Sequence, residues 1–387
     1  MSMWDDWKSL RRFQRLPPRD RSIVFYSETH QDWHHLQPLI DFLIERLSRT
    51  VCHVTSELTV PLPSAPDAGL HAFRIRPGAL CTWFFQTLKA DVMVLTMLDL
   101  HNFHLKRSLH PVHYAYVFHS MGSTHMVDHA NSYDHYDTLL CVGPHHVAEI
   151  RRREELFRLP SKRLFEHGYP RLERLVALAD ATEPKRSETT TALLAPTWGE
   201  HSILHLCGEP LISFLLEAGI RVILRPHYQT TRSSPRLVER LVARFGSDPG
   251  FRHVVRMEES VSLLESDVLI CDWSAMAIEY ALGFGKPVLF VDVPPRVRNP
   301  DYAALRLEPM EMRIRRELGA VLPLDRLADA PRQVSLLLRD AAELRKRNVA
   351  RREEWVFNFG RSVEVGACEI ARIADERAGA GARGRQA

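Results

Sequence analysis

His119 is the residue of this 387-residue chain best placed for proton transfer. It directly follows an apolar run at 113–118 that indicates a strand, and a turn containing Gly122 comes after it. A histidine at the carboxyl end of a parallel strand points into the crevice where α/β proteins bind ligands. Because an imidazole titrates near neutrality, His119 can take a proton from an attacking hydroxyl. The chain has 20 histidines, so most of them must serve structure.

The tripeptide Arg225-Pro226-His227 offers two hydrogen-bond donors to an anion. It follows a short apolar run at 221–224, and the proline fixes the turn, so the arginine and the histidine are presented together. The structural alternative is an arginine bonded to nearby carbonyls and a histidine at the surface. We expect the pair to bind an anionic group.

A further strand end supplies Arg171. The run that starts near residue 164 ends at Gly168 and Pro170, which places Arg171 near the same crevice as His119. A guanidinium is suited to phosphate. We therefore assign Gly122 and Arg171 to the acceptor or phosphate side of a site.

A complete β-α-β unit is encoded in the second half of the chain. Two apolar runs, 268–271 and 288–291, indicate buried parallel strands with one helix between them. Asp272 or Ser274 can cap the start of that helix, whose N-terminus would bind a phosphate well. Glu279, about one and a half turns further on, would reach the ribose if the phosphate belongs to a nucleotide. The alternative is an ordinary crossover in which Asp272 and Ser274 are only caps.

Strands and helices alternate through both halves of the chain, which predicts a doubly wound α/β fold. The expected strands of the first half are 23–26, 51–55, 71–75, 91–97, 113–118 and 136–142, with another near 164. Those of the second half are 191–195, 221–224, 254–256, 268–271 and 288–291. The expected helices are 33–47, 80–88, 147–156 and 206–218, with long amphipathic helices within 327–359.

A polar segment without periodicity, 181–190, indicates a linker between two domains. The expected parts are an amphipathic arm at 1–20, a Rossmann-like domain at 21–180, the linker, a second Rossmann-like domain at 191–330, terminal helices at 331–376 and a disordered tail at 377–387.

The composition excludes several classes of protein. The net charge of +3 is nearly balanced and no dense basic stripe accompanies it, which argues against a dedicated nucleic-acid binder. The six cysteines are scattered, and several lie in apolar runs as small buried hydrophobic residues do. Since no signal peptide and no long uncharged apolar segment is found, we expect the chain in a reducing cytoplasm.

The first residues show a basic amphipathic pattern. Apolar side chains recur at three-residue spacing, at Trp4, Trp7, Leu10, Phe13 and Leu16. Between them lie the cations Lys8, Arg11, Arg12 and Arg15. Such a helix can lie on an anionic membrane surface or pack on the protein, and we favour packing because one short helix anchors weakly.

A metal site is the alternative suggested by the histidines His101, His104, His125 and His129. The last two are spaced to share one helix face. However, the His-Glu-x-x-His pattern is absent, and Asp91, Asp99 and Asp272 do not form the close carboxylate pair of a divalent-metal site. We therefore expect neither a metal nor another cofactor.

Taken in order, these motifs resemble those of the CDP-glycerol glycerophosphotransferases, which are the teichoic acid primases and polymerases and their capsule-polymerase relatives. The resemblance covers roughly residues 110–300, and several ordered motifs are much harder to meet by chance than one. It rests on His119, 168–171, 195–198, 225–227 and the segments 266–274 and 279–287. The chain departs from the family pattern at Ser120 and Met121, which precede Gly122 where the family has glycine directly after the histidine. Trp273 stands where tyrosine is usual.

The resemblance implies a fold similar to the two-domain GT-B glycosyltransferases. Two Rossmann-like domains would face a cleft, with the nucleotide held by the C-terminal domain. His119 would be the base and His227 the histidine on the diphosphate. Glu279 stands where the family usually has aspartate for the ribose. The implied donor-binding residues are Thr197, Arg225, Asp272, Ser274 and Glu279.

The resemblance also implies a reaction. An alditol phosphate, most often glycerol phosphate, would pass from a CDP-activated donor to a hydroxyl of a lipid-linked or polymeric glycan. His119 would deprotonate that hydroxyl, and CMP would leave with its charge held by His227, Arg225 and Ser274. The implied partners are this donor, this acceptor and the cytoplasmic face of the cell membrane, with no nucleic acid.

Two other functions stay open. A GT-B sugar transferase or sugar-nucleotide epimerase would use the same fold and phosphate contacts but would act at carbon. A non-catalytic nucleotide-binding module would recruit partners without turnover. Intact cellular activity of a folded His119→Ala variant would favour the module.

Overall fold

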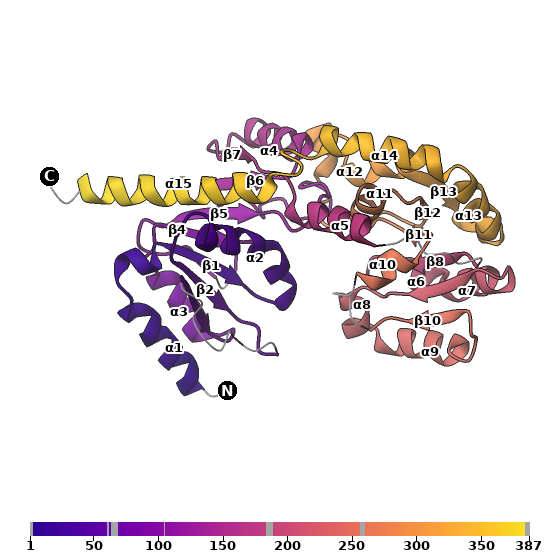
Figure 1. Cartoon of the computed structure of the whole chain (residues 1–387), viewed down its shortest axis with the longest axis horizontal. Helices are drawn as coiled ribbons and strands as arrows, with labels where there is room; N and C mark the ends of the chain where they lie inside the picture. Colours follow the sequence, from indigo (N-terminus) through magenta and orange to yellow (C-terminus); the bar gives the residue numbers. More distant parts are fainter. Residues whose placement is uncertain are drawn as a thin grey trace. The chain divides into compact units, whose positions relative to one another are not determined.

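The computed structural model describes residues 3–59, 62, 69–103, 105–182, 189–255 and 260–383. In these ranges the chain forms two parallel sheets with helices around them, and it divides into two compact units (Figure 1). The first unit contains Met1–His119, Asp128–Arg171 and Trp355–Ala387. The second contains Ser120–Val127 and Leu172–Glu354. The expected doubly wound α/β fold is confirmed.

The sheet of the first unit has seven parallel strands in the order β3-β2-β1-β4-β5-β6-β7. They are β1 (Ile23–Ser27), β2 (Val51–Thr55), β3 (Leu70–Arg74), β4 (Val92–Leu95), β5 (His113–Val117), β6 (Thr138–Cys141) and β7 (Arg163–Glu166). Strands β1, β2 and β4 are buried along their whole length, as their apolar sequences predict.

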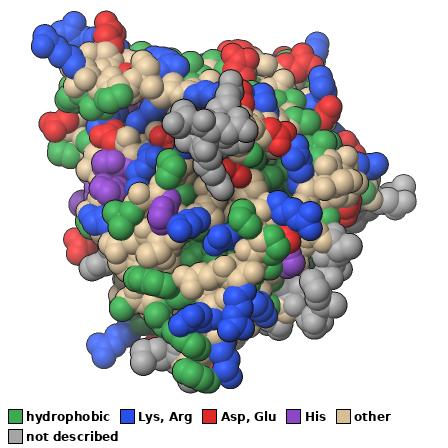
Figure 2. Space-filling view, turned by 90° about the vertical axis from the view of Figure 1, so that its left-hand side faces the viewer, with side chains coloured by type: hydrophobic (Ala, Val, Ile, Leu, Met, Phe, Trp, Pro, Cys, Tyr) green, Lys and Arg blue, Asp and Glu red, His purple; other side chains and the backbone are tan. Residues whose placement is uncertain are grey.

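The helices of the first unit include one from each end of the chain. They are α1 (Met3–Arg15), the 3-10 helix η1 (Pro18–Arg21), α2 (His30–Glu45), α3 (Ala79–Thr87), α4 (Pro144–Phe157) and α15 (Ser362–Arg383). Ile370 and Ile373 of α15 share one buried core with Leu36 and Ile40 of α2. Figure 2 views the molecule from the left-hand side of Figure 1, where hydrophobic and cationic side chains lie intermixed.

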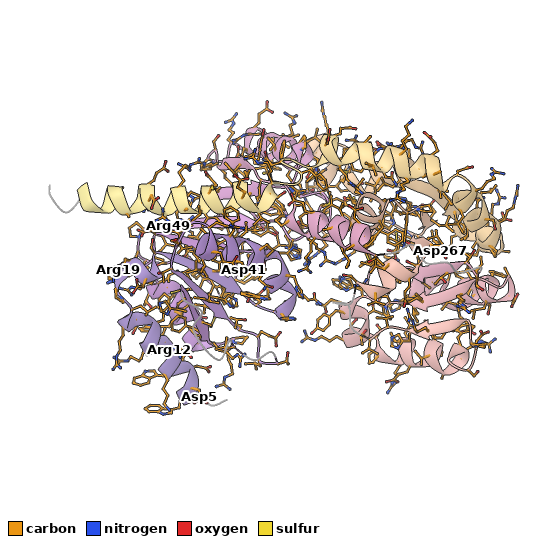
Figure 3. The ribbon with its side chains drawn as sticks, in the orientation of Figure 1. Asp5, Arg12, Arg19, Asp41, Arg49 and Asp267 are labelled. Carbon is orange, nitrogen blue, oxygen red and sulfur yellow. The ribbon has the colours of Figure 1, made fainter. Side chains whose placement is uncertain are left out.

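The end of α15 differs from the expectation of a disordered tail from residue 377. The helix continues to Arg383, through a stretch in which alanine, the best helix former, alternates with glycine, one of the poorest. Arg49, labelled in Figure 3, holds α15 by two hydrogen bonds to the Asp375 carboxylate, at 2.9 and 2.6 Å. Residues 384–387 lie outside the described ranges.

The sheet of the second unit has six parallel strands in the order β10-β9-β8-β11-β12-β13. They are β8 (Thr191–Leu194), β9 (Arg221–Leu224), β10 (Phe251–His253), β11 (Val268–Cys271), β12 (Val288–Asp292) and β13 (Gly319–Pro323). The strand expected at 254–256 begins too late: β10 ends at His253 and pairs Phe251 with Val222. Residue 256 lies outside the described residues. Strand β13 was not expected.

The helices of the second unit cover its sheet. They are α5 (Pro170–Ala181), α6 (Ile203–Leu206), α7 (Gly208–Glu217), α8 (Tyr228–Ser233), α9 (Pro235–Phe245), α10 (Val261–Glu265), α11 (Met276–Phe284), α12 (Met310–Glu317), α13 (Ala330–Arg339) and α14 (Ala341–Trp355), with the 3-10 helices η2 (Tyr302–Leu305) and η3 (Leu324–Asp329). Helix α5 begins with two residues of the first unit, Pro170 and Arg171, and α14 ends with one, Trp355. Within the described ranges, no helix combines the length and the apolar character needed to span a bilayer.

The boundaries of the units differ from the expected domains. The chain leaves the first unit after Arg171 rather than at 181–190, and it returns at Trp355. Residues 183–188 of the expected linker lie outside the described ranges. The short segment Ser120–Val127 belongs to the second unit, although it follows β5 of the first.

We predict that the first unit loses stability in acid, because two of its histidines are buried. Burial lowers the pKa of His53 to about 3 and that of His167 to about 4, whereas an unfolded histidine has a pKa of about 6.5. Their contribution is therefore complete above pH 6.5 and is lost as the pH falls toward 4. Denaturant unfolding between pH 8 and pH 5 should show a decline of about 1.4 kcal/mol per pH unit for each imidazole below pH 6.5.

A variant isolates this effect. His53→Gln should remove one imidazole's share of the pH dependence, and His201→Gln, at an exposed position, should not change it. Equal slopes in His53→Gln and the parent protein would contradict the assignment.

Candidate active site

The buried carboxylate of Asp272 joins the loops at the switch point of the second sheet, where the strand order reverses between β8 and β11. Its Oδ1 accepts the backbone N–H groups of Thr197 and Trp273, both at 2.8 Å, and its Oδ2 accepts that of Ile203 at 3.2 Å. Burial raises the pKa of Asp272, and these hydrogen bonds oppose the rise. Asp272 therefore positions the loops rather than capping a helix.

The start of α11 lies directly after these loops. Ala275 is the N-cap residue, so neither Asp272 nor Ser274 occupies the expected cap position, although Ser274 Oγ accepts the N–H of Met276 at 3.3 Å. The N-terminus of α11 directs the positive end of its dipole outward from the carboxyl end of β11. Glu279 lies in the first turn and is almost completely buried.

Gly122 lies in the second unit, close to the start of α11. A Cβ atom added there would lie 2.4 Å from Glu311 Oε1 and 3.5 Å from the Cβ of Ala275, so a larger residue would displace the Glu311 carboxylate. Glu311 Oε1 also accepts the backbone N–H of Ser123 at 2.9 Å. The structure thus brings Gly122 beside the candidate phosphate position.

His227 is held as an uncharged donor. Its Nδ1 accepts the backbone N–H of Gln229 at 3.1 Å, so the neutral ring carries its proton on Nε2. Burial, and after it the charge of Arg296, lowers the pKa of His227 to about 4. The Arg296 guanidinium lies 4.1 Å from the centroid of the Trp198 ring, whose own centroid is 6.3 Å from that of His227. The positive charge beside the uncharged His227 ring therefore comes from Arg296.

Two other arginines support these loops from inside. Arg225 is buried, and it donates a hydrogen bond to Ser262 Oγ at 3.5 Å. Arg315 donates to the backbone oxygen of Asp272 at 3.3 Å and to Asp292 at 2.6 Å. Sequence reasoning missed Arg315 and did not single out Arg296, because neither belongs to a motif.

His119 is exposed at the end of β5 in the first unit. Its Nδ1 is hydrogen-bonded to the Tyr116 hydroxyl at 3.1 Å, and its backbone oxygen accepts the Tyr169 hydroxyl at 3.0 Å. The ring of His35 lies 6.2 Å away, centroid to centroid. The hydrogen bond at Nδ1 leaves Nε2 for a substrate.

The candidate residues therefore divide between the units. The second unit contains Gly122, Thr197, Arg225, His227, Asp272, Ser274 and Glu279. The first contains His119 and Arg171, each the last residue before the chain enters the second unit. Arg171 is half-buried in the first turn of α5.

The alternative metal site does not assemble from the residues that the structure describes. In those ranges, no three His, Cys, Asp or Glu side chains are grouped as metal ligands would be. His125 and His129 share no helix, and His125 Nε2 lies 3.4 Å from the backbone oxygen of Leu307. His101 Nδ1 accepts the N–H of Arg107 at 3.0 Å, and His104 lies outside the described residues.

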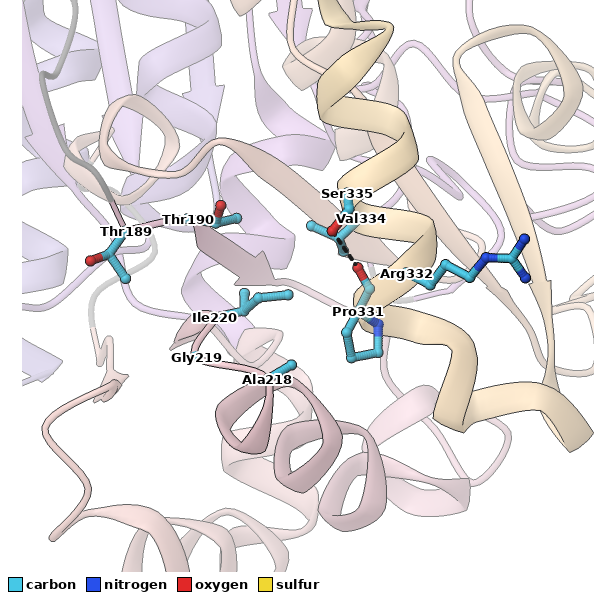
Figure 4. A pocket seen from close by; sticks show the side chains of 9 residues that line it. All are labelled: Thr189, Thr190, Ala218, Gly219, Ile220, Pro331, Arg332, Val334 and Ser335. Carbon is cyan, nitrogen blue, oxygen red and sulfur yellow. Dashed lines mark hydrogen bonds between the residues drawn. The ribbon is translucent and has the colours of Figure 1, made fainter.

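A separate groove of about 430 Å³ lies at the amino ends of β8 and β9, beside the start of α13 (Figure 4). Thr190, Ile220, Arg332 and Ser335 are among its lining residues, and Ser335 Oγ donates to the backbone oxygen of Pro331 at 3.0 Å. Ligands of parallel sheets bind at the carboxyl ends of the strands. We therefore assign the candidate site to Asp272 and its neighbours rather than to this groove.

The family model described as CDP-Glycerol:Poly(glycerophosphate) glycerophosphotransferase matches residues 75–293, which is more than half of the chain. The chain belongs to this family. The matched range includes His119, Arg171 and the loops after β8, β9 and β11. A search of the curated proteins found no match.

Several solved structures have the same fold. The UDP-GlcNAc 2-epimerase of Methanocaldococcus jannaschii, in complex with UDP-GlcNAc and UDP, has a TM-score of 0.59 at 14% identity, over 92% of this chain and 99% of that one. A glycosyltransferase from Rickettsia africae has a TM-score of 0.53 at 10% identity, over 91% and 98%. A putative UDP-N-acetylglucosamine 2-epimerase from Listeria monocytogenes has a TM-score of 0.54 at 10% identity, over 88% of this chain and 93% of that one. The chain is thus a transferase-family member with a GT-B-like fold.

The role of Asp272 can be tested against a matched carboxylate. Asp267, labelled in Figure 3, accepts the N–H of Thr191 at 2.8 Å near the amino end of β11, far along the strand from the candidate site. Asp272→Ala should cost about 3 kcal/mol or more of unfolding free energy, because three N–H groups lose a charged acceptor. Asp267→Ala should cost about 1–2 kcal/mol.

Nucleoside diphosphate binding, measured by calorimetry on both folded variants, separates support of the site from general stability. Asp272→Ala should weaken binding about ten-fold or more, and Asp267→Ala should leave it unchanged. An equal loss in the two variants would show that Asp272 has no special relation to the site.

Proposed function

We propose that the protein transfers an alditol phosphate, glycerol phosphate first among the candidates, from a CDP-activated donor to a hydroxyl of a cell-surface polymer or of its lipid-linked precursor. The family match carries this proposal, because it spans His119 together with the loops around Asp272. The described side chains add support, since they provide an uncharged donor at His227 and a cation at Arg296.

In this proposal the second unit holds the donor. Its diphosphate accepts hydrogen bonds from Ser274 Oγ and from Nε2–H of His227. The Thr197 hydroxyl is hydrogen-bonded to the Asp272 carboxylate, so its one proton is used there and the residue serves the site by position. Arg296 and the N-terminus of α11 balance the negative charge. Glu279, in the first turn of α11, binds ribose hydroxyls.

The proposed reaction is one displacement at phosphorus. The acceptor oxygen forms a bond to the phosphorus that carries the alditol, and the bond from that phosphorus to the bridging oxygen breaks. CMP leaves with the electron pair, and the acceptor's proton goes to Nε2 of His119. His227 and Arg296 stabilise the charge that develops on the leaving phosphate. Positioning and charge stabilisation supply most of the rate, with no cofactor in the scheme.

The acceptor places the proposed reaction at the cell envelope. A lipid-linked precursor of a teichoic acid or capsule polymer would be met at the cytoplasmic face of the membrane, so the protein would act as a peripheral enzyme there. Arg171 and the backbone around Gly122 would serve the acceptor or the transferred phosphate.

A second candidate function is transfer or epimerisation of a sugar. It is favoured by the M. jannaschii epimerase, whose structure is similar and contains UDP-GlcNAc and UDP. The donor would then carry uridine, and the reaction would take place at a sugar carbon. A non-catalytic nucleotide-binding module is the remaining alternative.

A donor screen tests these functions directly. Nucleotide release would be followed from CDP-glycerol, CDP-ribitol and UDP-GlcNAc, each with and without a lipid-linked acceptor. We expect acceptor-dependent CMP from a CDP-alditol. Release of UDP from UDP-GlcNAc alone would support the sugar transferase, and binding of a nucleotide without release from any donor would support the module.

Three variants connect the screen to the site. His119→Ala and His227→Ala should each lower the rate by about 10²–10³-fold, as expected for loss of a base or of a charge-stabilising donor. His227→Gln should keep more activity than His227→Ala, because glutamine retains an uncharged N–H donor. Equal rates in the two His227 variants would contradict the donor role.

A further inference from the structure

Helix α1 carries an aromatic and basic stripe on its solvent face. Trp4 and Trp7 are 60% and 37% exposed, and their rings stack with centroids 5.0 Å apart. Lys8 Nζ lies 5.8 Å from the centroid of Trp4, and the Arg11 guanidinium lies 4.7 Å from that of Trp7. Arg15, exposed one turn later, extends the same face.

The opposite face of α1 is fixed to the first unit. The Phe13 ring packs edge-on against Phe73 and Phe84, with centroids 5.4 and 5.2 Å apart. Asp6 is buried and forms an ion pair with Arg76 at 2.7 Å. The helix therefore packs on the protein, as expected from the sequence, while the stripe stays on the outside.

We propose that the stripe formed by Trp4, Trp7, Lys8, Arg11 and Arg15 docks the protein on an anionic lipid bilayer. Tryptophan rings favour the interface between headgroups and acyl chains, and lysine and arginine are attracted by anionic headgroups. Of the two acids in the first turn of α1, Asp6 is turned inward to Arg76, and half-buried Asp5 sets one negative charge against the three cations of the stripe. In the lower part of Figure 2, at the height of α1 in Figure 1, hydrophobic and cationic side chains lie next to each other.

The charge and size of the stripe favour a bilayer over a second copy of the chain. Two stacked rings bordered by three cations form a narrow strip rather than the broad apolar surface of a stable dimer. The cations require an anionic partner, and each contributes about five-fold to binding near an anionic leaflet. Because α1 is packed on the unit, no folding cost is needed to present the stripe.

Co-sedimentation of the full chain with vesicles tests this proposal without donor, acceptor or turnover, so its outcome is independent of the proposed function. The protein should bind phosphatidylcholine vesicles containing about one-third phosphatidylglycerol and should bind pure phosphatidylcholine at least ten-fold more weakly. Lys8→Glu/Arg11→Glu and Trp4→Ala/Trp7→Ala should each weaken binding about ten-fold or more.

Matched controls come from exposed positions of the second unit. Arg236→Glu/Arg240→Glu on α9 and Leu206→Ala on α6 should bind vesicles as the parent protein does. Circular dichroism confirms that each variant is folded. The proposal would be overturned by equal binding to both vesicle types or by unchanged binding of the α1 variants. It would also be overturned if light scattering showed a dimer that dissociates only in the α1 variants.

A second, independent observation concerns the residues behind His119. The hydroxyl of Tyr116, which bonds Nδ1 of His119 at 3.1 Å, is also hydrogen-bonded to the hydroxyl of Tyr133. The Tyr133 hydroxyl donates in turn to Asp128 Oδ2 at 2.6 Å. Tyr116 and Tyr133 are buried, and burial raises the pKa of both well above the ordinary value. All four residues belong to the first unit.

The direction of these hydrogen bonds follows from the proton count. An ionised carboxylate only accepts, so the single proton of Tyr133 goes to Asp128. Tyr116 must then donate to Tyr133, and its oxygen is left to accept from Nδ1–H of His119. A neutral imidazole with its proton on Nδ1 has a lone pair on Nε2.

We infer that Asp128, through Tyr133 and Tyr116, fixes the His119 tautomer whose Nε2 can accept a proton. Asp128, Tyr133 and Tyr116 are thus positioning residues for the base. This inference deepens the proposed function. It rests on that function only where His119 is taken to act as the base during turnover. The tautomer itself is measurable in the free protein.

Nitrogen-15 NMR of histidine-labelled protein tests the inference, with His119→Gln identifying the signal. His119 should show a protonated Nδ1 and an unprotonated Nε2 in its neutral form. Tyr133→Phe should shift the ring toward the Nε2–H tautomer, and Asp128→Asn, which keeps an acceptor, should shift it less than Asp128→Ala.

Tyr169→Phe is the matched control, because that hydroxyl donates to the backbone oxygen of His119 rather than to its ring and should leave the tautomer unchanged. A protonated Nε2 in the parent protein, or an unchanged ring in Tyr133→Phe, would overturn the inference. The expected tautomers without transfer from any donor would leave the inference standing and reject the proposed reaction.

Discussion

The carboxylate of Asp272 accepts backbone N–H groups from two parts of the chain that are far apart in the sequence: the segment from the loop after β8 to the start of α6, and the loop after β11. Removing this carboxylate from water is unfavourable, and the three hydrogen bonds offset much of that cost. The loops around the switch point are consequently held by one buried group. The positions of Ser274, of the N-terminus of α11 and of the Thr197 hydroxyl all depend on it.

Much of the motif around α11 supports the site rather than forming it. Lys286 donates to three backbone oxygens at the end of α10 and beyond, those of Leu263, Leu264 and Ser266. Ser266 is in turn hydrogen-bonded to the Tyr280 hydroxyl at 2.9 Å. Some residues of this motif therefore hold the backbone of the loops in place instead of contacting a ligand.

The strands and the strand-end residues could be predicted from the sequence, since buried parallel strands are apolar runs and their carboxyl ends lie at one edge of a sheet. His227 and Ser274 were selected as candidates in this way. The site's supporting contacts could not be predicted. Tyr116 is an aromatic residue within a strand and Tyr133 lies in a loop, so nothing in the local pattern indicates that their hydroxyls meet. Arg315 reaches Asp272 across a long sequence separation, from a helix without a motif.

The same limit applies to the segment Ser120–Val127. Its sequence continues from β5, but its backbone is held by residues of the second unit, since Met126 O accepts the N–H groups of Arg298 and Asn299. Only the three-dimensional structure shows which unit such a segment joins. A prediction based on neighbouring residues assigns it to the strand that precedes it.

The return of α15 to the first unit affects how the chain is completed during synthesis. The core of that unit contains Leu36 and Ile40 from the beginning of the chain and Ile370 and Ile373 from its last helix. The second unit ends at Glu354 and is translated in full before α15 emerges from the ribosome. The first unit is therefore completed only after the whole second unit has been translated, and the apolar face of α2 lacks part of its cover until then.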